Sequence, residues 1–150
     1  MSYYDSMIEN VERARDAQPV REFVLEDLEQ LKSIERAIYI IEEDGGDCEA
    51  TFQAMSAYKK MSDRACPKLN QPSPVLYVGS SVTGIKKRIK QHLGDGPKGT
   101  YALHLSHWFT GKVRITIKTY EERPEVIQII EDAISHELKP AFGKSGANNK

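Results

Sequence analysis

The sequence predicts an α+β domain, a small and mainly antiparallel sheet of three strands flanked by helices. Three observations predict this class. Apolar runs at 37–41 and 75–79 are typical of buried strands. Residues 113–118 alternate between apolar and polar side chains, as in a half-exposed strand. Segments with helical spacing precede and follow these strands, so helices can cover the sheet.

Helical spacing dominates the start of the chain. Four apolar residues recur at helical intervals among acids in 22–33, which predicts an amphipathic helix within an N-terminal helical extension, 1–34. After the first strand, 48–63 is a weakly patterned helix. Three prolines then favour an extended or looping chain up to residue 74.

The second half of the chain has clearer boundaries. Thr83 is the expected N-cap of a helix that runs to about Leu93, where a Gly-Asp-Gly-Pro turn ends it. A short helix is expected over 100–108. The last helix begins at Pro124, which suits a first helical turn, and ends near Leu138.

Length and composition indicate one globular domain of 150 residues. No apolar run approaches the roughly 20 residues of a membrane span, and the start lacks the layout of a signal peptide. Cys48 and Cys66 have neither CxxC spacing nor His-rich neighbours, which favours reduced thiols. We therefore expect a cytoplasmic protein without a membrane segment.

Charge is distributed unevenly along the chain. The net charge of −1 weighs mildly against nucleic-acid binding. However, residues 1–31 hold eight acids against three arginines, whereas 82–98 hold five basic residues against one acid. The basic segment can attract phosphates, although a solvated helix face is the alternative interpretation.

The expected helix at 84–93 interrupts its own apolar stripe. Ile85, Ile89 and Leu93 occupy core-facing positions, but Arg88 and His92 share that face. A shielded guanidinium and imidazole need partners, which a carboxylate or a phosphate can supply. The alternative is an arginine–acid pair at the core rim with a structural histidine.

Further candidate residues lie on the last helix and on the strands. Glu131 falls just beyond the apolar arc of its helix, where it can reach a shielded cation, and Glu137 is a rival. One carboxylate with water is a reasonable Mg²⁺ site. Tyr39 and Tyr77 are expected in the core, and Gly79 allows close approach of another group. For the histidines and tryptophan of 104–108, packing is preferred over contact with a base.

Taken together, these residues resemble the GIY-YIG nuclease superfamily, and most closely its compact stand-alone and restriction-type members. Ala37-Ile38-Tyr39 stands where the Gly-Ile-Tyr triplet is expected, and Tyr77-Val78-Gly79 stands for Tyr-Ile-Gly. The other matches are the Arg-x-x-x-His helix, the metal-binding glutamate and its downstream proline: Arg88, His92, Glu131 and Pro140.

The resemblance implies an endonuclease that hydrolyses DNA phosphodiester bonds with Mg²⁺, which Mn²⁺ can replace. Glu131 would hold the metal, and Arg88 would stabilise charge on the phosphate. Tyr77, with Tyr39 and His92 nearby, would position or deprotonate the attacking water, with the base open between Tyr77 and His92. The implied substrate contacts are Lys86, Lys87, Lys90, Lys144 and Asn148.

Three differences from the family pattern are visible. Ala37 replaces a glycine, residues 44–74 form an insertion between the triplets, and the late asparagine expected near Gly143 is absent unless Asn148 or Asn149 replaces it. The resemblance also allows a homodimer. The alternatives to a nuclease are a catalytically silent nucleic-acid-binding module on the same fold and a protein-interaction module.

Overall fold

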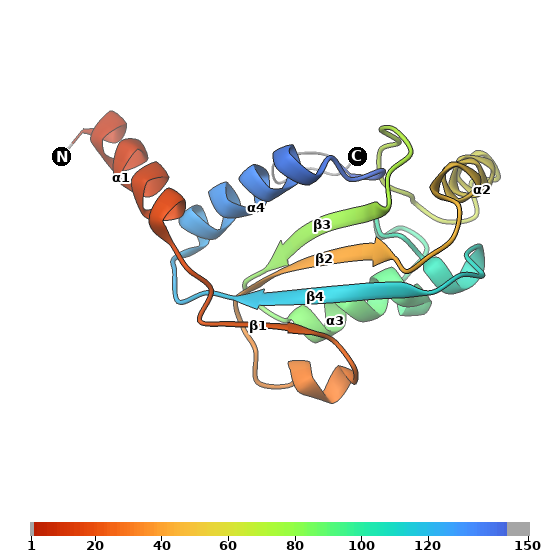
Figure 1. Cartoon of the computed structure of the whole chain (residues 1–150), viewed down its shortest axis with the longest axis horizontal. Helices are drawn as coiled ribbons and strands as arrows, with labels where there is room; N and C mark the ends of the chain where they lie inside the picture. Colours follow the sequence, from red (N-terminus) through yellow and green to blue (C-terminus); the bar gives the residue numbers. More distant parts are fainter. Residues whose placement is uncertain (1, 144–150) are drawn as a thin grey trace.

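The computed structural model describes residues 2–143 and shows an α+β fold (Figure 1). The chain forms, in order, α1 (Tyr3–Asp16), β1 (Arg21–Val24), the 3₁₀ helix η1 (Leu28–Leu31), β2 (Ala37–Glu43), α2 (Cys48–Lys60), β3 (Val75–Ser81), α3 (Ile85–Lys90), the π-helical turn η2 (Gln91–Asp95), the 3₁₀ helix η3 (Leu105–His107), β4 (Val113–Thr119) and α4 (Pro124–Leu138). None of the helices within 2–143 is both long and apolar enough to cross a membrane.

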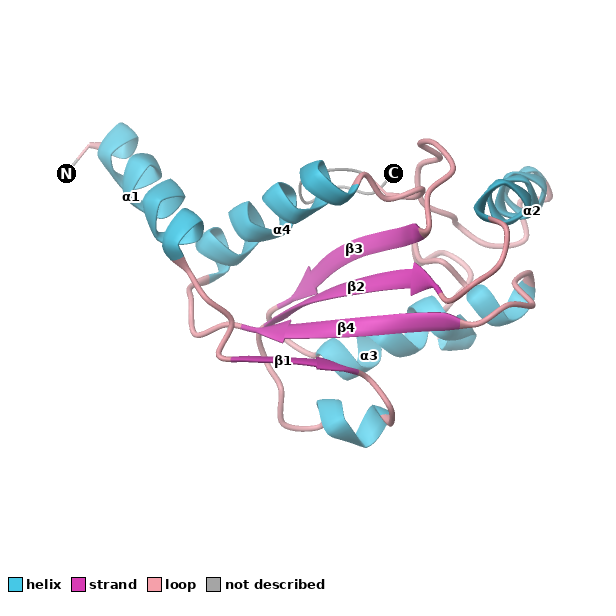
Figure 2. Cartoon of the chain, in the orientation of Figure 1, coloured by secondary structure: helices cyan, strands magenta, loops and turns pink. Residues whose placement is uncertain are grey.

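The sheet has four antiparallel strands in the order β1-β4-β2-β3, so the prediction of three strands was wrong in number (Figure 2). The additional strand, β1, lies within the N-terminal extension that was predicted to be helical. Residues 21–24 pair with 116–119 of β4. This pairing satisfies backbone groups of β4 that would otherwise lie at an open sheet edge.

The predicted helix at 22–33 was therefore wrong except for its last turn. After β1, Asp27 caps η1, and the Gln30 side chain accepts from the Asp27 backbone N–H in return. Phe23 and Leu28 both pack against the sheet core. Their spacing fits a strand followed by one helical turn as well as a continuous helix, and tertiary pairing selects the first arrangement.

The two faces of the sheet carry separate cores. Along β2, Ala37, Tyr39 and Ile41 pack with α3, whereas Ile38 and Ile40 pack with α4. We call these sides the α3 face and the α4 face. In Figure 1, α3 lies behind the sheet and α4 runs along the β3 side. The period-two alternation of one strand thus determines which residues meet which helix.

The boundaries around α3 differ from those predicted. Gly84, not Thr83, precedes the helix, and no side chain caps it. The α-helical part ends at Lys90, and η2 continues it as a π-helical turn to Asp95 that contains Gly94 at φ +133°. Instead of a helix over 100–108, only the short η3 forms. By contrast, α4 begins and ends as predicted, at Pro124 and Leu138.

Candidate active site

Two tyrosines from neighbouring strands form the centre of the candidate site. Tyr39 of β2 and Tyr77 of β3 lie on the α3 face, each about 1% exposed, with parallel rings 6.1 Å apart. Tyr39 pairs with Gly79 of β3. A Cβ atom at Gly79 would collide with the Tyr39 phenol and would lie 2.9 Å from Cε1 of Tyr77. Glycine is therefore required for close approach, as its place in the strand predicted.

His92 completes this group from η2, which follows α3. Its ring is fully buried, 4.4 Å from the Tyr77 ring centre, and its Nε2 lies 2.9 Å from the Tyr39 hydroxyl. The other ring nitrogen, Nδ1, accepts a hydrogen bond from the Leu103 backbone N–H at 3.1 Å. The histidine that interrupted the predicted apolar stripe is thus bonded at both nitrogens.

These two bonds determine the His92 tautomer. A backbone N–H can only donate, so Nδ1 must present a lone pair to Leu103. Burial lowers the pKa of His92 well below its ordinary value, and the charge of Arg88 lowers it further, so the ring is neutral near pH 7. Neutral imidazole carries its one proton on Nε2 in this arrangement. His92 therefore donates to the Tyr39 oxygen and has no free lone pair.

Arg88 lies one helical turn before His92 and is half-buried. Its Nη2 donates to the Tyr77 hydroxyl at 3.2 Å, and its Nη1 donates to Gln91 Oε1 at 3.1 Å. Burial raises the pKa of Tyr39 well above its ordinary value, whereas the charge of Arg88 and a hydrogen bond from it lower that pKa. We call Tyr39, Tyr77, Arg88 and His92 the Tyr–His–Arg cluster.

Glu131 approaches the cluster from α4, which packs on the other face. Its side chain is buried, with Oε1 accepting from Ser80 Oγ at 2.6 Å and Oε2 from Gln128 Nε2 at 3.4 Å. Ser80 belongs to β3, one of the two edge strands of the sheet. The four cluster residues thus contact one another directly. Glu131 instead contacts β3, the strand that carries Tyr77, from the α4 side.

Glu131 and the cluster interact electrostatically. Burial raises the pKa of the Glu131 carboxyl, and the Ser80 hydrogen bond and the positive charge of Arg88 lower it. Conversely, the charge of Glu131 is among the causes that raise the pKa of Tyr39. The predicted carboxylate, guanidinium and phenol are therefore close enough to influence one another's ionisation.

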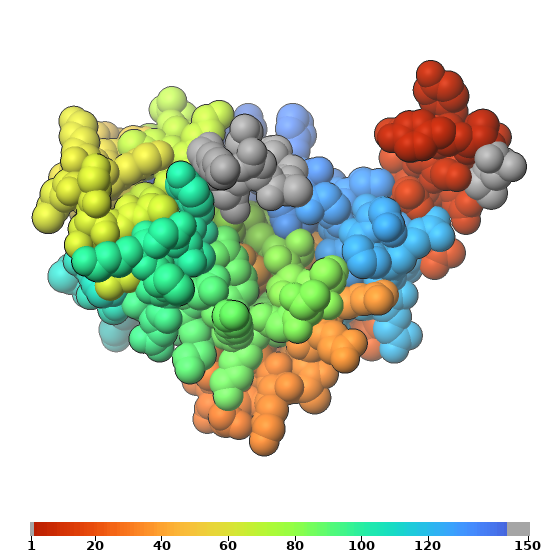
Figure 3. All heavy atoms as spheres, turned by 180° about the vertical axis from the view of Figure 1, so that it is seen from behind, coloured from red at the N-terminus to blue at the C-terminus, as the bar shows by residue number. Residues whose placement is uncertain are grey.

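The other predicted residues are less closely connected. Lys87 and Lys90 are exposed on α3, whereas Lys86 forms an ion pair with Glu29 at 2.9 Å. Figure 3 shows the face behind the sheet, where the green segment around α3 lies between the yellow α2 region and the orange segment after β1. Glu137, the rival to Glu131, is exposed near the end of α4. Lys144, Asn148 and Asn149 lie outside the described residues.

Two residues near the site were not singled out by sequence reasoning. Ser80 directly binds Glu131, and only its place after a strand glycine could have suggested it. Asn70, from the insertion, donates to the carbonyls of Pro140 at 3.1 Å and Gly143 at 2.8 Å. Asn70 thus contacts Gly143, the position near which the family's late asparagine was expected, but it comes from a distant part of the sequence, which spacing cannot reveal.

Comparison of the chain with protein-family models, curated proteins and solved structures gave no match. Function is therefore inferred from the site geometry together with the sequence motifs.

Proposed function

We propose that this protein is a Mg²⁺-dependent endonuclease of the GIY-YIG type that hydrolyses phosphodiester bonds in DNA. The observation that supports it best is the Tyr–His–Arg cluster itself. Its four side chains come from β2, β3, α3 and η2 and make mutual contacts of 2.9–3.2 Å. A hydrophobic core needs no such group, since aliphatic residues fill the opposite face of the same strands.

Glu131 fits the role of a single protein ligand for Mg²⁺. Within the described part of the chain, no three His, Cys, Asp or Glu residues are grouped as a metal site. Mg²⁺ binds with one or two carboxylates and keeps several waters, so one glutamate with substrate oxygens suffices. Burial raises the pKa of Glu131, and a bound cation would favour its ionised form. The ion would supply Lewis-acid polarisation of a phosphate oxygen.

The residues of the chain have separable tasks in this proposal. Arg88 is half-buried, and its positive charge would stabilise negative charge on the phosphate oxygens. His92 cannot take the proton of a water, because both of its ring nitrogens are occupied and Nε2 carries the hydrogen. We therefore assign proton removal to a tyrosine, with His92 donating to the Tyr39 oxygen.

Between the two tyrosines, Tyr77 is the preferred base. The Arg88 guanidinium donates to its oxygen, which would stabilise the phenolate form of Tyr77, the form that can accept a proton from the attacking water. Tyr39 is held by His92 at one side and overlies Gly79 at the other. It would position Tyr77 and hold the local hydrogen-bond arrangement during the reaction.

A nicking assay tests the proposal. Supercoiled, linear, branched, flap and single-stranded DNA are incubated with the pure protein and Mg²⁺, Mn²⁺ or EDTA. We expect metal-dependent cutting that Glu131→Gln reduces by about 10²–10³-fold. Gln retains the acceptor for Ser80, so the fold should persist. Glu137→Gln is the matched control on the same helix and should cut like the wild type.

Failure of the folded wild type to cut any of these substrates with either metal would exclude catalysis. Salt-dependent DNA binding without cutting would then favour a silent binding module, whereas absent binding would favour a protein-interaction module. The homodimer remains a prediction, and light scattering of the full chain with and without DNA tests it.

A further inference from the structure

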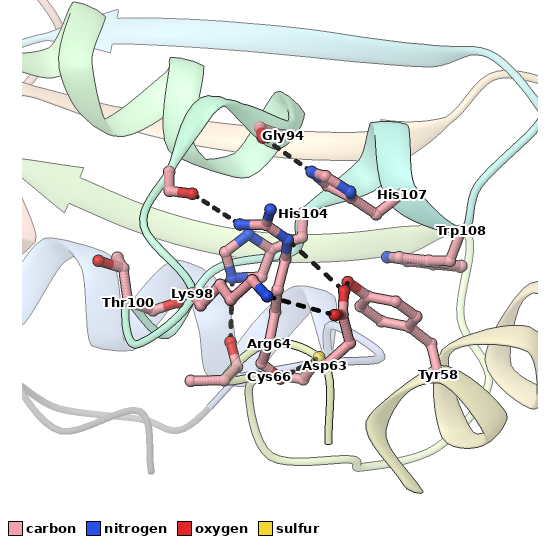
Figure 4. Close-up of polar contacts among 12 residues, drawn as sticks. Tyr58, Asp63, Arg64, Cys66, Gly94, Lys98, Thr100, His104, His107 and Trp108 are labelled. Atoms are coloured by element: carbon pink, nitrogen blue, oxygen red, sulfur yellow. Dashed lines mark hydrogen bonds and ion pairs between the residues drawn. The ribbon is translucent and has the colours of Figure 1, made fainter. Parts of the chain in front are cut away.

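A second buried histidine, His104, has no task in the proposed chemistry. Its side chain is fully buried, and the residue immediately precedes η3. Its backbone has φ +50°, a left-handed conformation that is uncommon for residues other than glycine. Figure 4 shows it at the centre of polar contacts between the loop 94–108 and residues 58–66 of the insertion.

The His104 ring joins two separate segments of chain. Its Nε2 lies 2.8 Å from the Thr100 carbonyl and 3.1 Å from the Ala65 carbonyl. Carbonyl oxygens only accept, so Nε2 must carry a proton that both of them share. Nδ1 is buried and has no hydrogen-bond partner among the described residues. The ring therefore serves as a donor that holds Ala65 against Thr100.

Neighbouring contacts reinforce this junction. The Arg64 side chain donates to the Gly96 carbonyl at 2.8 Å, and the Ala65 N–H donates to the Lys98 carbonyl at 2.7 Å. Asp63 accepts from the Tyr58 hydroxyl at 2.8 Å. The insertion is thus anchored to the loop that follows η2 through backbone and side-chain bonds.

These contacts between the insertion and the loop 94–108 lie next to the candidate active site in the sequence. Leu103 immediately precedes His104, and its N–H donates to Nδ1 of His92. On the other side of the same residue, the Leu103 carbonyl accepts from Trp108 Nε1 at 2.6 Å. The Leu103 backbone is therefore held between His104 and Trp108, with its N–H directed at His92.

We propose that His104, together with residues 63–66 of the insertion, positions Leu103 so that His92 is locked in the tautomer that donates to Tyr39. The catalytic consequence rests on the proposed nuclease function, whereas the tautomer itself does not. His104 is a positioning residue, since it acts on His92 through Leu103, whose N–H donates to the His92 ring. The insertion that departs from the family pattern then has a role in building the site.

Nitrogen NMR of the uniformly labelled full chain tests this inference without substrate. In the wild type, we expect His92 to give the two separated ring-nitrogen signals of one neutral Nε2–H tautomer, with a coupling from the Leu103 amide across the hydrogen bond. A wild-type His92 that carries its proton on Nδ1 would overturn the inference before any variant is made.

Two variants at position 104 then isolate the shared donor. His104→Gln keeps an N–H group near the place of Nε2, whereas His104→Leu fills similar space without a donor, and both incur the left-handed backbone cost. We expect the Leu variant to lose the Leu103 coupling and the single His92 tautomer, and the Gln variant to retain both. Unchanged His92 signals and coupling in the folded Leu variant would contradict the proposal.

Cleavage measurements separate this inference from the nuclease proposal. If DNA is cut, His104→Leu should lower the rate on the order of 10–100-fold, as loss of a residue that orients a functional histidine commonly does, and Gln should rescue it. Glu131→Gln should lower cutting by about 10²–10³-fold while the His92 signals stay unchanged. Absence of any cutting would remove the nuclease proposal and leave the tautomer result intact.

Discussion

The two faces of the sheet differ in chemistry although the same strands supply both. The apolar cluster of the α4 face consists of aliphatic side chains and one tyrosine: Ile38, Ile40, Val75, Val78, Tyr120, Val126, Ile127 and Ile130. Glu131, a buried charged residue bonded to Ser80, lies on the same side. The α3 face has an aliphatic core as well, but it also contains the Tyr–His–Arg cluster. Adjacent residues of β2, Ile38 and Tyr39, belong to different faces.

This difference indicates that alternating residues of a strand serve stability on one face and the proposed chemistry on the other. Aliphatic side chains stabilise a core without any partner, whereas each polar group on the α3 face must be hydrogen-bonded before it can be buried. Such networks are weak evidence for stability, because replacing them by apolar groups is often neutral. Substitutions one residue apart should therefore separate folding from activity.

The largest expected effect is on stability and comes from the α4 face. Ile38→Ala should lower the free energy of unfolding by about 2–5 kcal/mol, since the fully buried side chain leaves a cavity. Ile38→Val should cost about 0.5–1.5 kcal/mol. Urea unfolding measures both. The cleavage rate per folded molecule should not change, and a large loss of rate in the folded Ile38→Val variant would break the division between the faces.

Arg88→Gln should lower the cleavage rate and leave stability almost unchanged, the reverse of the Ile38 variants. We expect the cleavage rate to fall by about 10²–10³-fold, equivalent to about 2.7–4 kcal/mol, because charge on the phosphate loses the guanidinium that would stabilise it. The unfolding free energy should change little, since Gln can still donate a hydrogen bond. Lys87→Gln is the control on the same helix: it should weaken DNA affinity and reduce its salt dependence without changing the rate at saturation.

The contrast between the faces was only partly predictable from the sequence. The strands β2, β3 and β4 and the helix α4 follow from alternation, apolar runs and proline positions, so they were located correctly. β1 was missed because four residues with mixed spacing fit a helix equally well. Arg88 and His92 were found because they interrupt an expected apolar face, and Glu131 because it lies at the edge of one. His104 was assigned to packing, because a loop has no periodicity from which a shared donor could be inferred.

Gly79→Ala tests whether the phenols need the space above β3. The added methyl would overlap the Tyr39 ring and press on Tyr77, so we expect a loss of about 1–3 kcal/mol in stability and reduced cleavage. Gly84→Ala is the matched control, because its Cβ would meet no atom within 4 Å and its φ of 172° is extended. Equal behaviour of the two variants would show that the phenols can move without consequence.

The smallest expected effect is the pH dependence of the free energy of unfolding. It should change when an ionisable residue of the site is replaced, but not when an aliphatic residue of the α4 face is. Burial lowers the pKa of His92 below its ordinary value of 6.5, and burial also lowers that of His104. The unfolded chain therefore binds protons that the folded chain does not. Stability should be complete above about pH 6.5 and should decrease as pH falls below it, by at most about 1.4 kcal/mol per pH unit for each histidine.

Glu131 has the opposite effect on stability. Burial raises its pKa, so the folded chain binds its proton more readily than the unfolded chain does. On acidification it offsets part of the loss caused by the histidines. Replacing His92 with Gln should thus flatten the decrease in unfolding free energy between pH 7 and 5, whereas Glu131→Gln should steepen it at the acidic end. Ile38→Val, on the α4 face, should keep the wild-type slope. If all three variants share one slope, the ionisable groups of the site do not control acid stability, and the pKa shifts that their burial implies are absent.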